Sequence, residues 1–242
     1  MDIVLLGSGK VATQLGRAFK MAGQTIVQVW SRNLEHAKEL ADTVASEAIS
    51  DLDDINRSAD LYIIAELASS LDIGDNLIVH TSGSTSIEAL DGVSSHTGVF
   101  YPLQTFSKNK AVDFRSVPIA IEASNPEDLA AIRAIADRLS ERVTELDSAQ
   151  RKALHVAAVF ACNFTNHLMA ISQQLLKSEN LDFDLLRPLI AETAGKVQLY
   201  DPETVQTGPA IRGESEIINT HLEMLQENPG WQELYEQLSQ SI

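Results

Sequence analysis

The sequence predicts an α/β fold: a Rossmann-type, mostly parallel sheet with helices on both faces, followed by an all-α C-terminal domain. Three observations carry this prediction. An apolar strand at residues 2–7 runs into a glycine-rich turn and a helix, strand and helix patterns then alternate, and only helical patterns follow residue 148. Alternation is typical of a parallel sheet, because each strand needs a crossover to return to the same edge. The predicted domains are therefore residues 1–147 and 148–242.

The first domain contains further strand candidates, at residues 25–33, 59–65, 76–83, 97–103, 116–123 and 143–146. Helical stretches intervene, notably at residues 34–44 and 126–142. In the second stretch, apolar residues recur at helical spacing, which predicts one face turned toward the sheet. These residues are Leu129, Ile132, Ile135, Ala136 and Leu139.

The composition limits the function classes. The 242 residues carry a formal net charge of −16, which argues against a nucleic acid or an anionic membrane as partner, since both need a broad basic surface. Cys162 is the single cysteine, so an internal disulfide is excluded, and its apolar neighbours predict a buried, inert thiol. Asp2 and Gly7 interrupt any secretory signal, and no uninterrupted apolar stretch approaches the roughly 20 residues of a membrane span. We expect a cytoplasmic protein.

The segment "GSGKVA" at residues 7–12 is compatible with two kinds of phosphate-binding loop. A triphosphate loop needs a glycine, four spacers and then Gly-Lys-Ser/Thr, because the lysine reaches the outer phosphates and the hydroxyl holds magnesium. Lys10 follows Gly9 here, but Val4 occupies the place of the first glycine and Val11 that of the hydroxyl. The triphosphate interpretation therefore lacks half of its chemistry.

The dinucleotide pattern fits the same segment better. Gly7 would make the tight turn after the strand, Gly9 would let the pyrophosphate approach the backbone, and the small Ala12 would let helix and strand pack closely. We expect the cofactor to be bound here by Gly7, Ser8, Gly9, Lys10, Val11 and Ala12.

The end of the second strand indicates which dinucleotide is bound. In NAD-binding folds an acidic residue about 20 residues after the glycines accepts a hydrogen bond from the ribose 2′-hydroxyl. This chain has Ser31 and Arg32 there, and a hydroxyl and a guanidinium would hold a 2′-phosphate that an acid would repel. The sequence therefore predicts NADP as the cofactor. The alternative is that Arg32 is only a solvated strand end.

Two more strand ends belong to the predicted cofactor site. Ligands in such sheets lie beyond the carboxyl ends of the strands, which adds Ala65, His80 and Thr81 to the cofactor contacts. Only ten residues separate Ala65 from the next strand candidate, barely enough for a parallel crossover. Either the crossover is unusually short or residues are missing between Ala65 and Glu66, and we favour missing residues.

The second domain begins with one long helical stretch at residues 149–178, apolar on nearly every side in its middle. Such helices are buried, often by a second subunit as well as their own domain. His155 and Asn163 lie two helical turns apart, about 12 Å along the axis, so one substrate could span them. The alternative is that they cap neighbouring backbone or bridge subunits. Further helices are predicted at residues 183–198, interrupted by Pro188, at 215–226 and near the C-terminus.

The whole chain resembles a bacterial family in which an NADP-binding Rossmann domain precedes a helical domain of unknown function. The resemblance rests on "GSGKVA", "VWSRN", "HTSGS", "GVFYPLQTF", "LHVAAVFACNF" and "GPAIRGESEIINTHLEML". Family members are labelled NADP oxidoreductases and are distant relatives of pyrroline-5-carboxylate reductase, ketopantoate reductase and the 6-phosphogluconate dehydrogenase-like enzymes. The resemblance implies hydride transfer to or from a small C=O or C=N substrate, and a homodimer built on the helical domains. The alternative is a non-catalytic NADP-binding sensor or scaffold dimer.

The resemblance also bears on the catalytic residues. Hydroxy-acid enzymes of the wider group carry a lysine followed four residues later by an asparagine, whereas Lys152 here is followed by Val156 at that spacing. Proton transfer would then fall to His155, with Asn163 holding the substrate.

Other residues of the predicted substrate site come from three segments. His80 and Tyr101 are alternative proton donors, and Ser82 and Tyr101 would contact the substrate. Arg212 stands on a turn fixed by glycines in an acidic protein, where it is either an anion clamp for the substrate or a solvated surface residue.

Overall fold

The computed structural model describes residues 1–65, 71 and 73–242, which form two compact units, Met1–Cys162 and Asn163–Ile242. The first unit extends past residue 147, and the side chains of Ser148 and Arg151 at the start of the following helix α4, Ser148–Ala158, bind the carboxylate of Glu122 in the sheet. The division into domains at residues 147 and 148 stays a prediction.

The first unit is built on one sheet, with strand order β3-β2-β1-β4-β5-β6-β7-β8 in the described part of the chain. All neighbouring strands are parallel except β6 and β7. The strands are β1 Asp2–Leu6, β2 Thr25–Trp30, β3 Glu47–Ile49, β4 Leu61–Ile64, β5 Leu77–His80, β6 Thr97–Pro102, β7 Ile119–Ala123 and β8 Val143–Glu145. The mostly parallel sheet is confirmed, and the short β3 is an addition that the sequence did not indicate.

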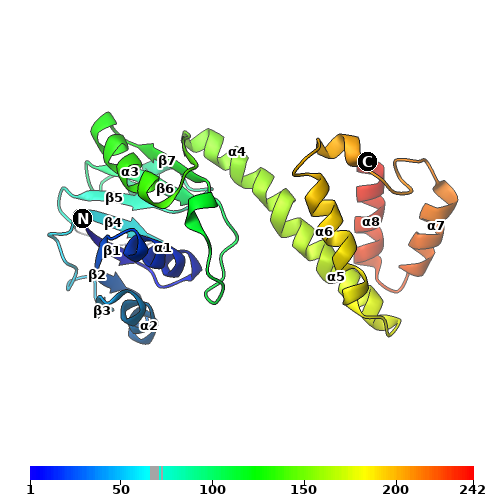
Figure 1. The fold of residues 1–242 in the computed structure, drawn as a ribbon, viewed down its shortest axis with the longest axis horizontal. Helices are drawn as coiled ribbons and strands as arrows, with labels where there is room; N and C mark the ends of the chain where they lie inside the picture. Colours follow the sequence, from blue (N-terminus) through cyan, green and yellow to red (C-terminus); the bar gives the residue numbers. More distant parts are fainter. Residues whose placement is uncertain (66–70, 72) are drawn as a thin grey trace. The chain divides into compact units, whose positions relative to one another are not determined.

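Three helices, α1 Lys10–Met21, α2 Leu34–Val44 and α3 Pro126–Leu139, share one hydrophobic core with one face of the sheet (Figure 1). The opposite face buries Val4, Trp30 and Tyr62 against irregular segments and the 3₁₀ helix η1, Ile87–Leu90. Among the described residues, η1 is thus the helical segment that packs on this second face of the sheet.

Local sequence explains where the helices begin. The Asn33 side chain accepts from the backbone amides of Glu35 and His36 at the start of α2, and Asn125 accepts from the Asp128 amide at the start of α3. Asparagine is among the preferred N-cap residues because its carbonyl pairs with free amides of the first turn. Both helices begin where the sequence predicts.

Gly16 brings α1 close to its neighbours. A methyl group at Gly16 would lie 3.1 Å from Leu5 Cδ1 and 3.2 Å from Val44 Cγ1. This glycine therefore lets α1 approach both β1 and α2, while Ala12, for which we predicted that role, is buried one turn earlier.

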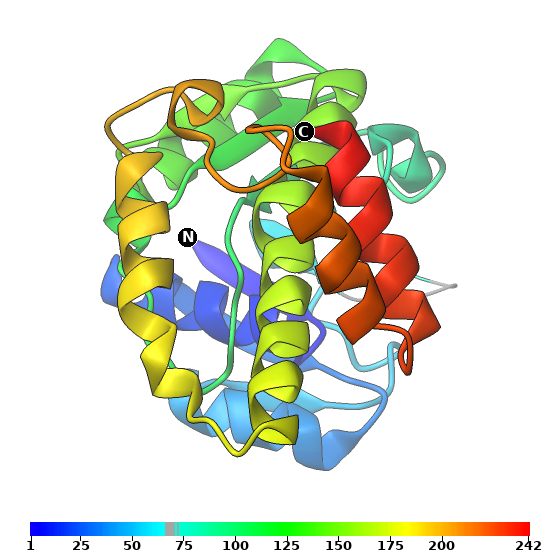
Figure 2. The same cartoon turned by 90° about the vertical axis from the view of Figure 1, so that its right-hand side faces the viewer.

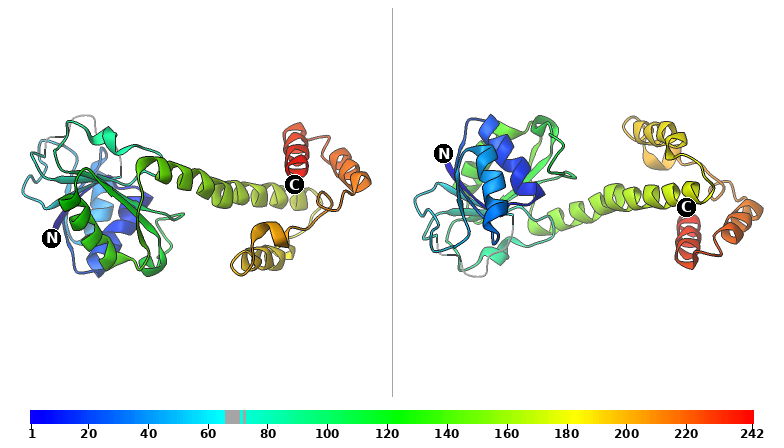
Figure 3. Two further views of the ribbon diagram at one scale, coloured as in Figure 1. Left: turned by 90° about the horizontal axis from the view of Figure 1, so that it is seen from above. Right: turned by 90° about the horizontal axis from the view of Figure 1, so that it is seen from below.

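The second unit consists of α5 Thr165–Ser178, α6 Arg187–Lys196, α7 Ser215–Met224 and α8 Pro229–Ser241. Helices α7 and α8 pack side by side (Figure 2), and α6 and α8 lie on opposite sides of α5 (Figure 3). Pro188 does not interrupt a helix but lies in the first turn of α6, where a missing amide is tolerated. Ile171 and Leu225 are the buried hydrophobic residues of this unit.

Two predictions about the long helical stretch need correction. Ser148–Ser178 is 31 residues long with a mean hydropathy of 1.3, so by length and composition alone it could cross a membrane. None of its most apolar window is buried, unlike the core helices of soluble proteins that meet the same criterion, and a single such helix is weak evidence for a span. Cys162 is exposed rather than buried, because the apolar side chains around it, such as Val156 and Phe160, are not covered by the chain itself.

Candidate functional site

The turn after β1 leaves backbone amides open to an anion. Gly7 has φ +125°, which a side chain would strain, and its amide donates to the Trp30 carbonyl at 2.8 Å. Gly9 is the N-cap of α1, no side chain caps the helix, and a methyl group at Gly9 would meet nothing within 4 Å. The first amides of a helix lack acceptors within it, so they are available to an anion at the positive end of the helix dipole.

A buried hydroxyl pair joins this turn to the end of β2. The Ser8 hydroxyl donates to Ser31 Oγ at 3.0 Å, and both residues are buried. Arg32 follows as an exposed residue before α2 begins. The structure thus brings the predicted cofactor residues of the glycine turn and of β2 together.

A hollow of about 280 Å³ lies beside the glycine turn, at the ends of β4 and β5. It unites five of the predicted site residues, and it is lined by Val11, Ile64, Ala65, His80, Thr81, Ser82 and Thr85. The predicted gap between Ala65 and Glu66 lies outside the described residues, because Glu66 is not among them.

His80 supports the loop that forms one wall of this hollow. Its Nδ1 accepts from the Ser82 amide at 3.2 Å, and its Nε2 lies 3.3 Å from the Ser86 carbonyl. Burial disfavours the charged imidazole and the nearby Arg151 repels it, which lowers the pKa of His80 to about 4. His80 is therefore neutral at physiological pH with both ring nitrogens engaged, so any contact with a cofactor would be through its other atoms.

Tyr101 and His155 form a hydrogen-bonded pair next to this loop. The Tyr101 hydroxyl lies 3.0 Å from Nδ1 of His155, and the two rings meet edge to face at 72°. Burial raises the pKa of the Tyr101 phenol, so the hydroxyl keeps its proton. His155 is half-buried, and its Nε2 has no hydrogen-bond partner in the described part of the chain.

Gly83 allows the loop to touch this pair. A methyl group at Gly83 would lie 2.7 Å from His155 Nδ1 and 2.8 Å from the Tyr101 hydroxyl oxygen. Real side chains do not come this close, so the approach requires glycine. The sequence signal was the glycine in "HTSGS", but its partners could not be read from it.

The fully buried Arg151 anchors α4 to the sheet, and sequence reasoning missed it. Its guanidinium pairs with Glu122 of β7, and its Nε donates to the Ser82 carbonyl at 3.2 Å. The same guanidinium also donates to the Thr85 carbonyl, and Ser148 binds the Glu122 carboxylate at 2.9 Å. The signal that could have revealed this network is a glutamate inside the otherwise apolar strand "IAIEA".

The remaining predicted residues lie in the second unit. Asn163 is exposed within the π-helical turn Val159–Phe164. Arg212 forms a two-pronged salt bridge with Glu214, at 2.8 Å for both bonds. The hydrogen bond to the Glu214 carboxylate raises the pKa of Arg212 above its ordinary value. Its charge is therefore neutralised by a neighbour, so an anion would have to compete with Glu214 for it.

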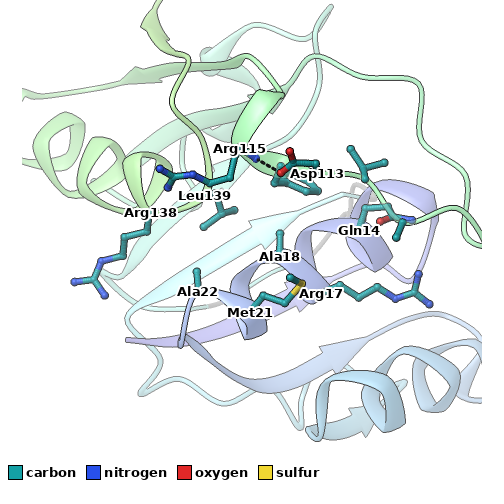
Figure 4. Close-up of a pocket in the computed structure, with 12 residues that line it drawn as sticks. Gln14, Arg17, Ala18, Met21, Ala22, Asp113, Arg115, Arg138 and Leu139 are labelled. Carbon is teal, nitrogen blue, oxygen red and sulfur yellow. Dashed lines mark hydrogen bonds between the residues drawn. The ribbon is translucent and has the colours of Figure 1, made fainter.

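A second hollow, of about 260 Å³, lies between α1, α3 and residues 111–115 (Figure 4). Its apolar floor includes Ala18, Ala22 and Leu139, with Arg17 and Arg138 among its polar residues. It contains none of the predicted site residues. No group of three potential metal ligands is found among the described residues.

Comparisons with known proteins match two different families to two parts of the chain. The family described as a domain of unknown function (DUF2520) matches residues 117–242, and the family shikimate/quinate 5-dehydrogenase matches residues 1–87. A crystal structure from Bacteroides fragilis, of an inferred NADP oxidoreductase, is 49% identical with a TM-score of 0.93 and covers 100% of this chain and 97% of its own. No curated protein matches the sequence.

More distant structures share the fold alone. A pyrroline-5-carboxylate reductase from Streptococcus pyogenes is 15% identical with a TM-score of 0.66, covering 100% of this chain and 99% of its own. An imine reductase from Myxococcus stipitatus, solved with NADP⁺, is 16% identical with a TM-score of 0.64. The match covers 100% of this chain and 93% of the imine reductase.

Proposed function

The chain belongs to the DUF2520 family, which matches more than half of its length, and from this premise we propose that it is an NADP(H)-dependent oxidoreductase. The observation that carries the proposal is the start of α1, which no side chain caps and where a methyl group at Gly9 would meet nothing within 4 Å. The relative from Bacteroides fragilis supports the same class, since its name is that of an NADP oxidoreductase.

The residues present fit NADP. The space over Gly9 allows a diphosphate to approach the helix amides, as in other dinucleotide sites. In the sequence, Ser31 and Arg32 follow β2 at the position where NAD-binding folds have an acidic residue that would repel a 2′-phosphate. Arg32 would pair with this phosphate, and Ser31, whose hydroxyl already accepts from Ser8, would hold the turn in place.

The chemistry proposed is hydride transfer to or from a small substrate with a C=O or C=N bond. The nicotinamide, when bound, supplies or accepts the hydride. We assign the proton to His155, because its Nε2 is open while its Nδ1 is held by Tyr101. Asn163 and Arg212 are proposed to bind the substrate with Ser82 and Tyr101. The names of the imine and pyrroline-5-carboxylate reductases support the C=N alternative.

The proposed assembly is a cytoplasmic homodimer formed through the helical domain, with a small molecule as substrate and with neither a nucleic acid nor a membrane as partner. Support comes from apolar side chains that the chain leaves uncovered: Val156 is 56% exposed and Phe160 is 65% exposed. Uncovered apolar patches of this kind are typical of interfaces.

The same exposed helix supports a second candidate function, a non-catalytic NADP-binding sensor or scaffold dimer. In that case the helical domain would serve dimerisation alone. Failure to oxidise NADPH across a broad panel of carbonyl and imine compounds, by a protein that binds NADPH, would favour this alternative.

The experiment for the cofactor is calorimetric titration of NADP and NAD into the wild type and Arg32→Ala. Loss of a charge-assisted hydrogen bond should weaken NADP by roughly 10- to 100-fold and leave NAD nearly unchanged. Arg133→Ala is the control, because Arg133 pairs with Glu145 instead, and it should alter neither affinity. Equal weakening of both nucleotides would contradict the role of Arg32, and no heat with either would overturn the proposed function.

A further inference from the structure

We propose that Tyr101 is a positioning residue, whose hydroxyl donates to Nδ1 of His155 and so keeps the ring proton on Nε2, the nitrogen to which the proposed function assigns proton transfer. This inference rests on the proposed function, since it concerns the proton of the reaction. The hydroxyl and Nδ1 are 3.0 Å apart.

The direction of the hydrogen bond follows from the partners available. A neutral imidazole has one donor and one acceptor nitrogen. The buried phenol remains protonated, and Nδ1 is the acceptor that its hydroxyl has among the described residues. Nδ1 must then be the acceptor nitrogen and Nε2 the donor.

Three elements fix this geometry. Tyr101 lies on β6, His155 lies on α4, and the loop at Gly83 presses against both. Arg151, one turn before His155, holds the Ser82 carbonyl of that loop at 3.2 Å. The imidazole is therefore confined on one side by the loop and on another by the phenol.

The proposed step balances atoms and charge. As a hydride reaches the carbon of a C=O bond, the π electrons move to oxygen, which takes the proton from Nε2 of His155. Nδ1 takes the phenol proton at the same time, so the imidazole stays neutral. Burial, the larger effect, raises the pKa of Tyr101 and disfavours the phenolate that remains, whereas the positive charge of Arg151 favours it. A proton from solvent then adds to Nε2 while Nδ1 returns its proton to Tyr101, which restores the starting tautomer.

The test needs neither substrate nor cofactor. Protein labelled with [¹⁵N]histidine has six histidines, and the signals of His155 are assigned from those absent in His155→Gln. In the wild type at neutral pH, Nε2 should carry the proton and Nδ1 should show the shift of a hydrogen-bonded acceptor. In Tyr101→Phe, the Nδ1 signal should move downfield as that bond is lost. A wild-type proton on Nδ1, or unchanged His155 signals in Tyr101→Phe, would overturn the proposal.

The second unit provides a matched control. Tyr235 bonds Nδ1 of His221 at 2.7 Å with rings at 82°, so Tyr235→Phe should move the His221 signals and leave those of His155 unchanged. Movement of His155 signals in this control would overturn the assignment.

Gly83→Ala gives an independent test that keeps the hydroxyl. Its methyl group would occupy space 2.7 Å from Nδ1, so it should move the Nδ1 signal of His155 in the same direction as Tyr101→Phe. An unmoved signal would contradict the proposed geometry. Calorimetry with NADP separates the two proposals: Tyr101→Phe should bind it as the wild type does, whereas absence of binding by the wild type sinks only the proposed function.

Discussion

His80 shows at the scale of one residue how burial assigns a role. The sequence placed it at a strand end beside the predicted cofactor, and the structure finds it 2% exposed with both nitrogens bound to its own loop. An imidazole in this position is useful because it can accept from one backbone group and donate to another. It is therefore a support for the loop.

The lowered pKa of His80 predicts a pH dependence of stability. The folded pKa is about 4, against 6.5 in the unfolded chain, so between these values the unfolded state binds more protons and stability rises with pH. Acidification from pH 6.5 to 4 should cost up to about 3 kcal/mol through this residue. Urea denaturation of the wild type and His80→Gln at several pH values would measure it. Curves that stay parallel across this range would contradict the prediction.

Single residues were also where the sequence was least informative. Gly83 belongs to the "HTSGS" segment, yet its close approach to Tyr101 and His155 joins segments that are distant in sequence. Arg151 is a single charged residue in the sequence of a helix, with no local pattern that indicates its burial. Neither role can be read from spacing, since both depend on which strand lies beside which loop.

At the scale of elements, α4 is attached to the sheet by its first turn. Asp147 and Gln150 form a capping box, which satisfies amides that the helix itself cannot. One turn on, the buried guanidinium of Arg151 meets Glu122, whose carboxylate also accepts from Ser148. The start of α4 is therefore fixed relative to β7 and to the loop after β5.

Glu122→Gln should destabilise the protein by about 2–4 kcal/mol, because it leaves the Arg151 charge buried without a counterion. Thermal or urea unfolding would measure the change. Glu145→Gln is the matched control: it breaks the Arg133 salt bridge, whose side chains are 36% and 53% exposed, and such pairs contribute at most about 1 kcal/mol. Similar losses in both variants would contradict the special position of Arg151.

Elements with strong periodicity or caps were predicted well. The sequence placed α2 and α3 at their observed starts, and β4 to β7 within a few residues. The sequence did not indicate β3, because its three residues are too few to show an alternation of apolar and polar side chains. It also misread Pro188, because proline interrupts a helix interior but is accepted in a first turn.

At the scale of the whole molecule, the uneven burial of the two units is the main clue to assembly. The second unit buries Ile171 and Leu225, while Leu185 and Leu189 are more than 60% exposed. A helical unit with so few buried apolar residues gains little hydrophobic stabilisation by itself. In the proposed homodimer, a second copy would bury these exposed apolar side chains.

Phe160→Glu should therefore convert the proposed dimer into a monomer, because a carboxylate cannot be buried there without a partner. Sedimentation equilibrium of the wild type and the variant would give the masses. Met21→Glu is the control, since Met21 is 89% exposed on α1 of the first unit and should leave the mass unchanged. A monomeric wild type, or a dimeric Phe160→Glu, would contradict the dimer. Association of the wild type with lipid vesicles would point instead to a membrane as the cover.

The sequence by itself determined the fold class and the kind of cofactor site. Both follow from short-range patterns: hydrophobic period, the glycine turn between Gly7 and Gly9, and the residues that end the second strand. The tertiary structure alone decided that Tyr101 meets His155, that Arg151 is buried against Glu122, and that Cys162 is exposed. The physical reason is that such contacts join distant segments through the order of strands in the sheet, and that order is set by packing of the whole chain.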